Sequence, residues 1–304
     1  MKTIVYIGDF SVSYSTELYI AKALESLGYN VLKFQEDNFL IQNAQRSVEE
    51  LKSLKPVLVM FSKGCPSGDA KGFIEELKKN KIPTCLWLFD LYFGLPVDRM
   101  RLLAKKFPPY NVETIFSTDG GHDKEWKELG INHKTLRQGI HEPEAIYYDL
   151  DKEKEVIFVG GDAFGNRKRL LTWLREQKGS NFEWYGQRDN RKRGLELNRI
   201  YGSSCIVVGD SQPSPHYWSN RVYETLGRGG FLLHPRVEGL EEEFEDGKHL
   251  VLYERDNLHE LDFLIRYYLD HPDEREAIRR AGFEHCKANY TYQHRCKELM
   301  KHYE

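Results

Sequence analysis

The chain has 304 residues, which is enough for two domains that each bury a hydrophobic core. Hydrophobic residues make up 40% and charged residues 30%, so the chain is too apolar to be disordered and too charged for a membrane protein. The formal net charge is −3, so no global field attracts the protein to nucleic acid or to anionic lipid. The apolar run at the N-terminus is too short for a signal peptide, and we expect a soluble, cytoplasmic protein without a membrane span.

Short apolar runs alternate with longer helical patterns, which is typical of βαβ units and parallel sheets. The first half predicts strands at 2–8, 30–34, 57–61, 83–89, 113–117 and 133–137, and helices at 15–27 and 47–54. Ser47 and Glu50 have capping-box spacing at the start of the second helix. The second half predicts strands at 156–159, 181–185, 205–208, 231–234 and 250–253, and helices at 167–177, 217–226, 258–269 and 273–288.

A polar segment without periodicity interrupts this alternation at residues 141–154, and a new strand pattern follows it directly. We therefore expect a linker in this segment and an α/β fold of two doubly wound, Rossmann-like domains, residues 1–145 and 146–290. Open α/β sheets bind ligands at the carboxyl ends of their strands, which predicts a cleft between the two sheets.

A glycine-containing loop follows the predicted strand at 156–159. Gly160 and Gly161 would let backbone N–H groups approach an anion, and Arg167 and Lys168 at the helix start supply positive potential. The segment matches neither the Walker A pattern nor G-x-G-x-x-G. A purely structural glycine turn is the alternative.

A second group of polar residues lies on the predicted helix at 217–226. Asn220, Arg221 and Glu224 share one helical face, and apolar residues occupy the opposite face. The arginine could hold a diphosphate, and the glutamate, one turn later, could hold two ribose hydroxyls. The alternative is a surface ion pair between Arg221 and Glu224, worth about 0–1 kcal/mol.

The second half of the chain resembles a known enzyme family. The R-x-x-E pattern at Arg221 is followed by a double glycine with an apolar strand, an acidic loop that ends in Gly247, the motifs EL and YYL, and a final TY with Arg295. These elements occur in the same order in the glycosyltransferases related to the spore-maturation protein CgeB. The resemblance covers roughly residues 156–296. It implies a two-domain GT-B fold with the nucleotide-sugar donor held mostly by the C-terminal domain and the acceptor by the N-terminal one, and residues 291–304 forming a helix that packs back on the N-terminal domain.

The same resemblance implies roles for single residues, with Arg221 on the diphosphate and Glu224 on the ribose. The whole donor site is expected to comprise Gly160, Gly161, Arg167, Lys168, Tyr185, Gly186, His216, Ser219, Asn220, Arg221 and Glu224. Many related retaining enzymes have a further glutamate eight residues before the ribose glutamate. This chain has His216 there, which argues against a retaining mechanism of that kind.

Displacement of a nucleoside diphosphate develops negative charge on the leaving phosphate, so arginine, lysine and helix N-termini should dominate catalysis. No D-x-D pair stands at a clear strand end, and the pair Asp149 and Asp151 falls in the expected linker. We therefore expect transfer without a metal or another cofactor.

An inverting enzyme also needs a base that takes the proton of the acceptor hydroxyl. The candidates follow strands of the N-terminal domain: Asp90, Asp9, and His122 with the neighbouring Asp119. We favour Asp90 because it ends a strongly apolar strand. Each of these residues could instead cap a helix.

The predicted function is that of a hexosyltransferase-like glycosyltransferase that uses a nucleotide sugar, with UDP-sugars favoured. The acceptor could be a glycan, a protein, a small metabolite or a modified DNA base, and the near-neutral charge argues against DNA. The sequence leaves three alternatives open: a nucleotide-sugar epimerase of the same fold, a DNA-base glycosyltransferase, and a nucleotide-binding module without catalysis.

Overall fold

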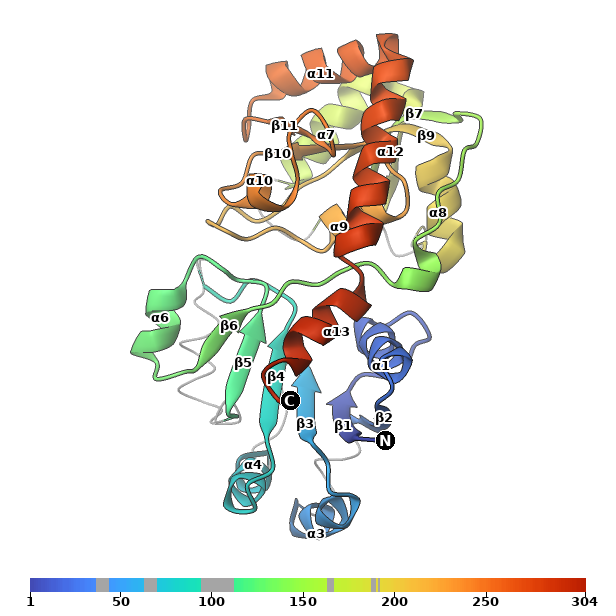
Figure 1. Cartoon of the computed structure of the whole chain (residues 1–304). Helices are drawn as coiled ribbons and strands as arrows, with labels where there is room; N and C mark the ends of the chain where they lie inside the picture. The colour runs from blue at the N-terminus through green and yellow to red at the C-terminus, as the bar shows by residue number, and fades with distance from the viewer. Residues whose placement is uncertain (37–43, 63–69, 94–111, 163–166, 187–189, 191) are drawn as a thin grey trace. The chain divides into compact units, whose positions relative to one another are not determined.

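The computed structural model describes residues 1–36, 44–62, 70–93, 112–162, 167–186, 190 and 192–304. They form two compact units, each built around a parallel sheet (Figure 1). The first unit comprises Met1–Gln138 and Tyr292–Glu304, and the second comprises Gly139–Thr291. The division lies before the expected linker because Ile140 and Ala145 are buried in the core of the second unit.

The first unit contains a six-stranded parallel sheet with the order β2-β1-β3-β4-β5-β6. Its strands are β1 (Thr3–Gly8), β2 (Asn30–Gln35), β3 (Leu58–Ser62), β4 (Thr84–Leu88), β5 (Thr114–Ser117) and β6 (His133–Thr135), all within a few residues of the predicted ranges. Every residue of β3, β4 and β5 is buried, because helices cover both faces of this sheet. The strand order reverses direction between β1 and β3, as in doubly wound folds.

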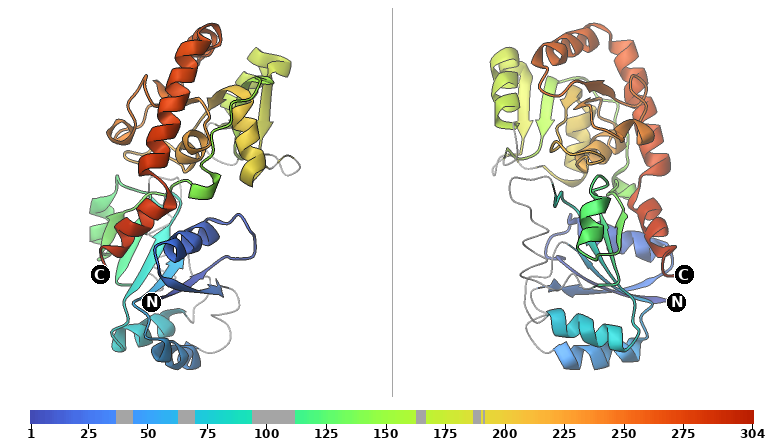
Figure 2. Two further views of the ribbon diagram at one scale, coloured as in Figure 1. Left: turned by 45° about the vertical axis from the view of Figure 1, so that its right-hand side comes forward. Right: turned by 90° about the vertical axis from the view of Figure 1, so that its left-hand side faces the viewer.

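Two helical layers enclose the first sheet (Figure 2). Helices α1 (Thr16–Ser26) and α13 (Tyr292–Met300) pack on one face, where Tyr292 and Cys296 join the core. Helices α3 (Ala44–Leu54), α4 (Ala70–Lys79) and α6 (Asp123–Glu128) pack on the other. The expected cap at Ser47 is wrong, because α3 begins at Ala44 and Ser47 lies inside the helix.

The second unit contains a five-stranded parallel sheet with the order β11-β10-β9-β7-β8. Its strands are β7 (Lys154–Val159), β8 (Phe182–Tyr185), β9 (Ser204–Val208), β10 (Leu232–Pro235) and β11 (Val251–Tyr253), which agree with the predicted positions. The order reverses between β7 and β9, so this sheet has its own switch point.

Helices also cover both faces of the second sheet. Helices α7 (Arg167–Lys178) and α11 (Leu258–Asp270) contribute to the core on one face, and α8 (Gly194–Gly202) and α9 (Arg221–Gly227) pack on the other. The short α10 (Leu240–Glu243) and the long α12 (Pro272–Asn289) complete the unit. None of the helices within the described ranges is long and apolar enough to cross a bilayer.

Helix α9 begins later than predicted, at Arg221 instead of residue 217. Residues 217–220 form a loop instead, and His216 just before them has a left-handed backbone conformation (φ 50°). Tyr217 and Trp218 in this loop are buried, so their apolar side chains belong to the core although they are outside the helix.

Candidate functional site

The predicted donor residues gather at the carboxyl edge of the second sheet. Gly160 follows β7 and Gly186 follows β8 directly, and Arg221 opens α9. Two charged residues that the sequence interpretation missed lie at the same edge, Asp210 two residues after β9 and Arg255 two residues after β11. The edge includes the switch point between β7 and β9, where doubly wound sheets bind ligands.

Three arginines surround one carboxylate at this edge, and we call Arg167, Arg221, Arg255 and Asp210 the arginine cluster. Nε of Arg167 donates to Oδ2 of Asp210 over 3.0 Å, and Nη1 of Arg255 lies 3.4 Å from Oδ1. Nη2 of Arg221 donates to the backbone carbonyl of Asp210 over 3.2 Å. Since the cluster contains three guanidinium groups and one carboxylate, it has a surplus of two positive charges.

The arginine cluster also has unused hydrogen-bond donors. Nε of Arg221 and Nη2 of Arg255 are buried and have no hydrogen-bond partner within the part of the chain that the structure describes. Burial, reinforced by repulsion from Arg167, lowers the pKa of Arg221 to about 10, although Asp210 opposes this shift. The guanidinium is still protonated at neutral pH, so the cluster is suited to bind an anion that accepts several hydrogen bonds.

The glycine loop leaves space for the side chains of the arginine cluster. Gly160 has a φ of 141°, and a Cβ at this position would collide with the guanidinium of Arg221. A Cβ on Gly186 would collide with the carbonyl oxygen of Gly160. Nη1 of Arg167 donates to the carbonyl of Gly161 over 2.7 Å, whereas Lys168 is exposed in the first turn of α7. The two predicted glycines therefore allow the loop to pack directly against the arginines.

A chain of hydrogen bonds fixes the loop that leads into α9. The backbone N–H of Ser219 donates to Oγ of Ser211 over 3.0 Å, and this Oγ lies 2.9 Å from Nε2 of His234. Nδ1 of His234 faces the carbonyl of Pro235 at 2.8 Å and must carry the proton, so Nε2 accepts the bond from Ser211. Burial lowers the pKa of His234 to about 3, which keeps the ring neutral in this role.

Glu224 is held by a buried arginine one turn further along α9. Nε of Arg228 donates to Oε2 of Glu224 over 2.8 Å, and Nδ2 of Asn220 lies 3.4 Å from Oε1. Arg228 is 2% exposed and also bonds to Glu144, to the carbonyl of Gly194 and to Oδ1 of Asn198. Glu224 therefore pairs with Arg228, and Arg221 bonds to Asp210. This differs from the surface ion pair between Arg221 and Glu224 that was the alternative from the sequence.

The remaining predicted donor residues occupy the rim of this edge. The backbone N–H of His216 donates to the carbonyl of Glu238 over 3.0 Å, and its Nε2 lies 3.5 Å from the Glu238 carboxylate. Tyr185 ends β8, and burial, together with a hydrogen bond to Glu183, raises the pKa of its hydroxyl. Oδ1 of Asn220 is buried without a hydrogen-bond partner in the described part of the chain.

The predicted base candidates all lie at the carboxyl edge of the first sheet. Asp9 follows β1, and its carboxylate accepts hydrogen bonds from the backbone of Ser11 (3.0 Å) and from Nε2 of Gln35 (3.2 Å). Ser15 caps α1, so Asp9 is not a helix cap. Asp90 lies two residues after β4 and is exposed to solvent.

The third candidate forms a carboxylate–imidazole pair. Nδ1 of His122 lies 2.6 Å from Oδ1 of Asp119, and the imidazole stacks on the ring of Phe93. Asp119 is fully buried, which raises its pKa, while the contact with His122 opposes the rise. His122 stands at the N-cap of α6 without a side-chain capping bond. With its N–H directed at Asp119, a neutral His122 has a lone pair on Nε2 that can accept a proton.

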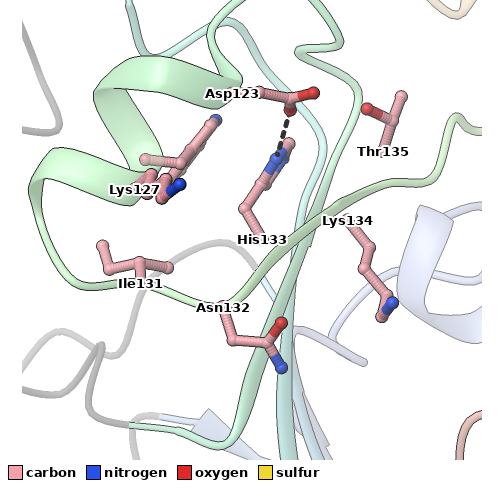
Figure 3. Close-up of a pocket in the computed structure, with 8 residues that line it drawn as sticks. Asp123, Lys127, Ile131, Asn132, His133, Lys134 and Thr135 are labelled. Atoms are coloured by element: carbon pink, nitrogen blue, oxygen red, sulfur yellow. Dashed lines mark hydrogen bonds and ion pairs between the residues drawn. The ribbon is translucent and has the colours of Figure 1, made fainter.

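A pocket of about 290 Å³ lies beside β6 (Figure 3). In its wall, Nδ1 of His133 is 3.2 Å from Asp123, Nε2 is 2.8 Å from Oγ of Ser117, and the ring stacks on Trp126. Burial lowers the pKa of His133 to about 4. Both ring nitrogens are engaged, so this histidine holds α6 to the sheet.

No set of three or more His, Cys, Asp and Glu side chains in the described ranges is arranged to hold a metal ion. Asp149 and Asp151, the D-x-D pair in the sequence, both lie in the segment before β7.

Part of the chain matches a known protein family. Residues 167–301 match a protein family described as glycosyl transferase-like, and this range contains the whole arginine cluster and α9. A search of curated protein sequences gives no match.

Solved structures resemble the chain over its whole length. A glycosyltransferase from Rickettsia africae has a TM-score of 0.68 at 12% identity, and the alignment covers 99% of this chain and 97% of the other. Sucrose-phosphate synthase from Thermosynechococcus elongatus gives 0.68 at 12%, covering 100% and 98%. The Anabaena protein HepE, solved with UDP-glucose, gives 0.65 at 10%, covering 99% of both chains.

These findings define the fold of the protein. The two Rossmann-like units have the fold of the GT-B enzymes, as expected from the sequence. The match to the glycosyl transferase-like family covers residues 167–301, which lie mostly in the second unit.

Proposed function

We propose that the protein transfers a sugar from a nucleotide-sugar donor, a UDP-sugar, to a hydroxyl group of an acceptor. The observation that carries the proposal is the arginine cluster at the switch point of the second sheet, with its surplus of two positive charges. The diphosphate of a nucleotide sugar has two negative charges and oxygen atoms that accept hydrogen bonds. The structurally similar HepE was solved with UDP-glucose, which supports uridine as the nucleoside.

Each part of the site has a proposed role in holding the donor. The unused donors of Arg221 and Arg255 bind phosphate oxygens, and Arg167 anchors the cluster to the glycine loop. Glu224 accepts hydrogen bonds from the ribose hydroxyls, and Arg228 fixes its carboxylate. The resemblance to the CgeB-related enzymes supports the same assignment for Arg221 and Glu224.

The arginine cluster also supplies the electrostatic part of catalysis in this proposal. As the bond from the sugar to the diphosphate breaks, negative charge grows on the leaving phosphate. Guanidinium groups that are already in position stabilise such charge strongly, because little reorganisation is needed. We therefore propose transfer that does not depend on a metal ion, and we expect full activity in EDTA.

We assign proton acceptance to His122. Asp119 accepts the Nδ1–H bond, so Nε2 can take the proton of the acceptor hydroxyl while its oxygen attacks the anomeric carbon and the nucleoside diphosphate leaves. Direct attack of this kind inverts the anomeric configuration. Asp90 and Asp9 are the other candidates; Asp9 accepts hydrogen bonds from Ser11 and Gln35, and Asp90 is exposed to solvent.

Thermal unfolding in the presence of UDP, GDP, dTDP and CDP tests the proposal. A ligand at 100 times its dissociation constant stabilises the folded protein by about 2.7 kcal/mol, so a selective shift with UDP is expected. Arg221→Ala and Glu224→Ala should abolish the shift. Arg266→Ala, which changes an exposed arginine on α11, is the matched control and should keep it. Absence of a shift with every nucleotide would overturn the proposal.

A further inference from the structure

Asp210 sets the charge of the arginine cluster. Its carboxylate contacts Arg167 and Arg255, and its backbone carbonyl holds Arg221, so the residue connects all three guanidinium groups. The backbone carbonyl alone would hold Arg221 whatever side chain residue 210 had. The negative charge is therefore a separate feature, and it reduces the surplus of the cluster from three positive charges to two.

The neighbouring acid belongs to a separate network. Glu224 is the other carboxylate of the donor site, and it pairs with Arg228. Arg228 also bonds to Glu144, so this second network of one cation and two carboxylates carries a net charge of −1 and adds no positive charge to the cluster. The surplus of two positive charges therefore counts only the four residues of the cluster.

The substrate and product of the proposed reaction differ in charge. In a nucleotide sugar both phosphates are esterified, so the diphosphate carries two negative charges at neutral pH. In the free nucleoside diphosphate the terminal phosphate has a second ionisation, with a pKa of about 6, and the total approaches three negative charges above pH 7. A more positive site therefore favours the product over the donor.

We propose that Asp210 is a specificity-determining residue that weakens binding of the nucleoside diphosphate product relative to the nucleotide-sugar donor. The inference rests on the proposed function, because it requires the diphosphate to bind at the arginine cluster. The carboxylate matches the cluster to the doubly charged donor. It also repels the additional charge that appears on the terminal phosphate when the sugar leaves, and so helps the product to dissociate.

The test is calorimetric measurement of the dissociation constants of UDP and UDP-glucose at pH 7.5 for the wild type and Asp210→Asn. The ligands differ by one charge, so removal of the carboxylate should tighten UDP binding about tenfold more than UDP-glucose binding. Asp270→Asn is the matched control, because Asp270 is exposed at the far end of α11. It removes the same charge and should leave the ratio of the two constants unchanged.

Arg255→Gln provides a reciprocal variant that does not depend on the folding of Asp210→Asn. It reduces the surplus to one positive charge, so UDP binding should weaken more than UDP-glucose binding. Equal changes for the two ligands in both variants, or an altered ratio in Asp270→Asn, would overturn the role of Asp210. If the wild type binds neither ligand, the proposed function itself fails, which is a different result.

Discussion

Replacement of Arg228 by methionine should destabilise the second unit strongly. Arg228 is 2% exposed, and its partners Glu144 and Glu224 have side chains that are only 14% and 19% exposed. Removal of the guanidinium leaves both carboxylates with poor access to water and without their cation. Loss of one partner of a buried ion pair costs about 3–5 kcal/mol. For a domain of this size that corresponds to a decrease in Tm of roughly 6–20 °C.

The assay is thermal unfolding, with hydrogen exchange to locate the effect. Amides in α8 and α9 should exchange faster, because Arg228 connects these helices through the carbonyl of Gly194. The triple variant Glu144→Gln, Glu224→Gln, Arg228→Met removes the buried charges as well and should recover at least half of the lost stability. A loss below about 1 kcal/mol in the single variant, as for an exposed pair, would refute the reasoning.

Other consequences can be measured in the same way. Gly160→Ala should weaken UDP binding at least tenfold in a titration, because the added methyl group displaces the guanidinium of Arg221; unchanged affinity would contradict this contact. His122→Gln should abolish transfer while UDP-glucose still binds, and Asp119→Asn should reduce the rate and alter its pH profile; a normal rate in His122→Gln would transfer the base role to another group. Burial lowers the pKa of His234 to about 3, so the unfolded chain binds a proton that the folded chain does not. The stability that the neutral His234 contributes is complete above pH ~6.5 and is lost at up to ~1.4 kcal/mol per pH unit as the pH falls. The free energy of unfolding of His234→Gln, measured in urea between pH 7 and 5, should therefore depend less on pH than that of the wild type.

The fold could be predicted because each strand has a local signal. Apolar β-branched runs separated by helical patterns are visible in short windows, and all eleven predicted strands occur in the structure. Arg221 and Gly160 were also accessible, since an R-x-x-E helix and a glycine turn after a strand are local patterns. Errors arose where a local pattern had two interpretations, as at Ser47, which fits a cap but lies inside α3.

The site residues that the sequence interpretation missed make contacts between positions far apart in the chain, which no short stretch of sequence reveals. Asp210 and Arg255 are isolated charged residues after strands, and their contact spans 45 residues of chain. Only the assembled sheet, which brings the carboxyl ends of β9 and β11 to one edge, makes them neighbours of Arg167. Arg228 is different. It stands four residues after Glu224, a spacing at which helical side chains meet, so the sequence did contain this signal.

Helix α13 follows the second unit in the sequence but belongs to the first unit, so its synthesis determines when the first unit can finish folding. Helix α13 supplies Tyr292, Cys296 and Leu299 to the core beneath α1, yet the ribosome makes it roughly 160 residues after Gln138. At 5–20 residues per second, this delay is about 8–30 s. The second unit is complete in the nascent chain before the first has its last helix. A chain released before residue 292 would therefore expose the apolar face of α1, and quality control would meet a folded second unit attached to an unfinished first one.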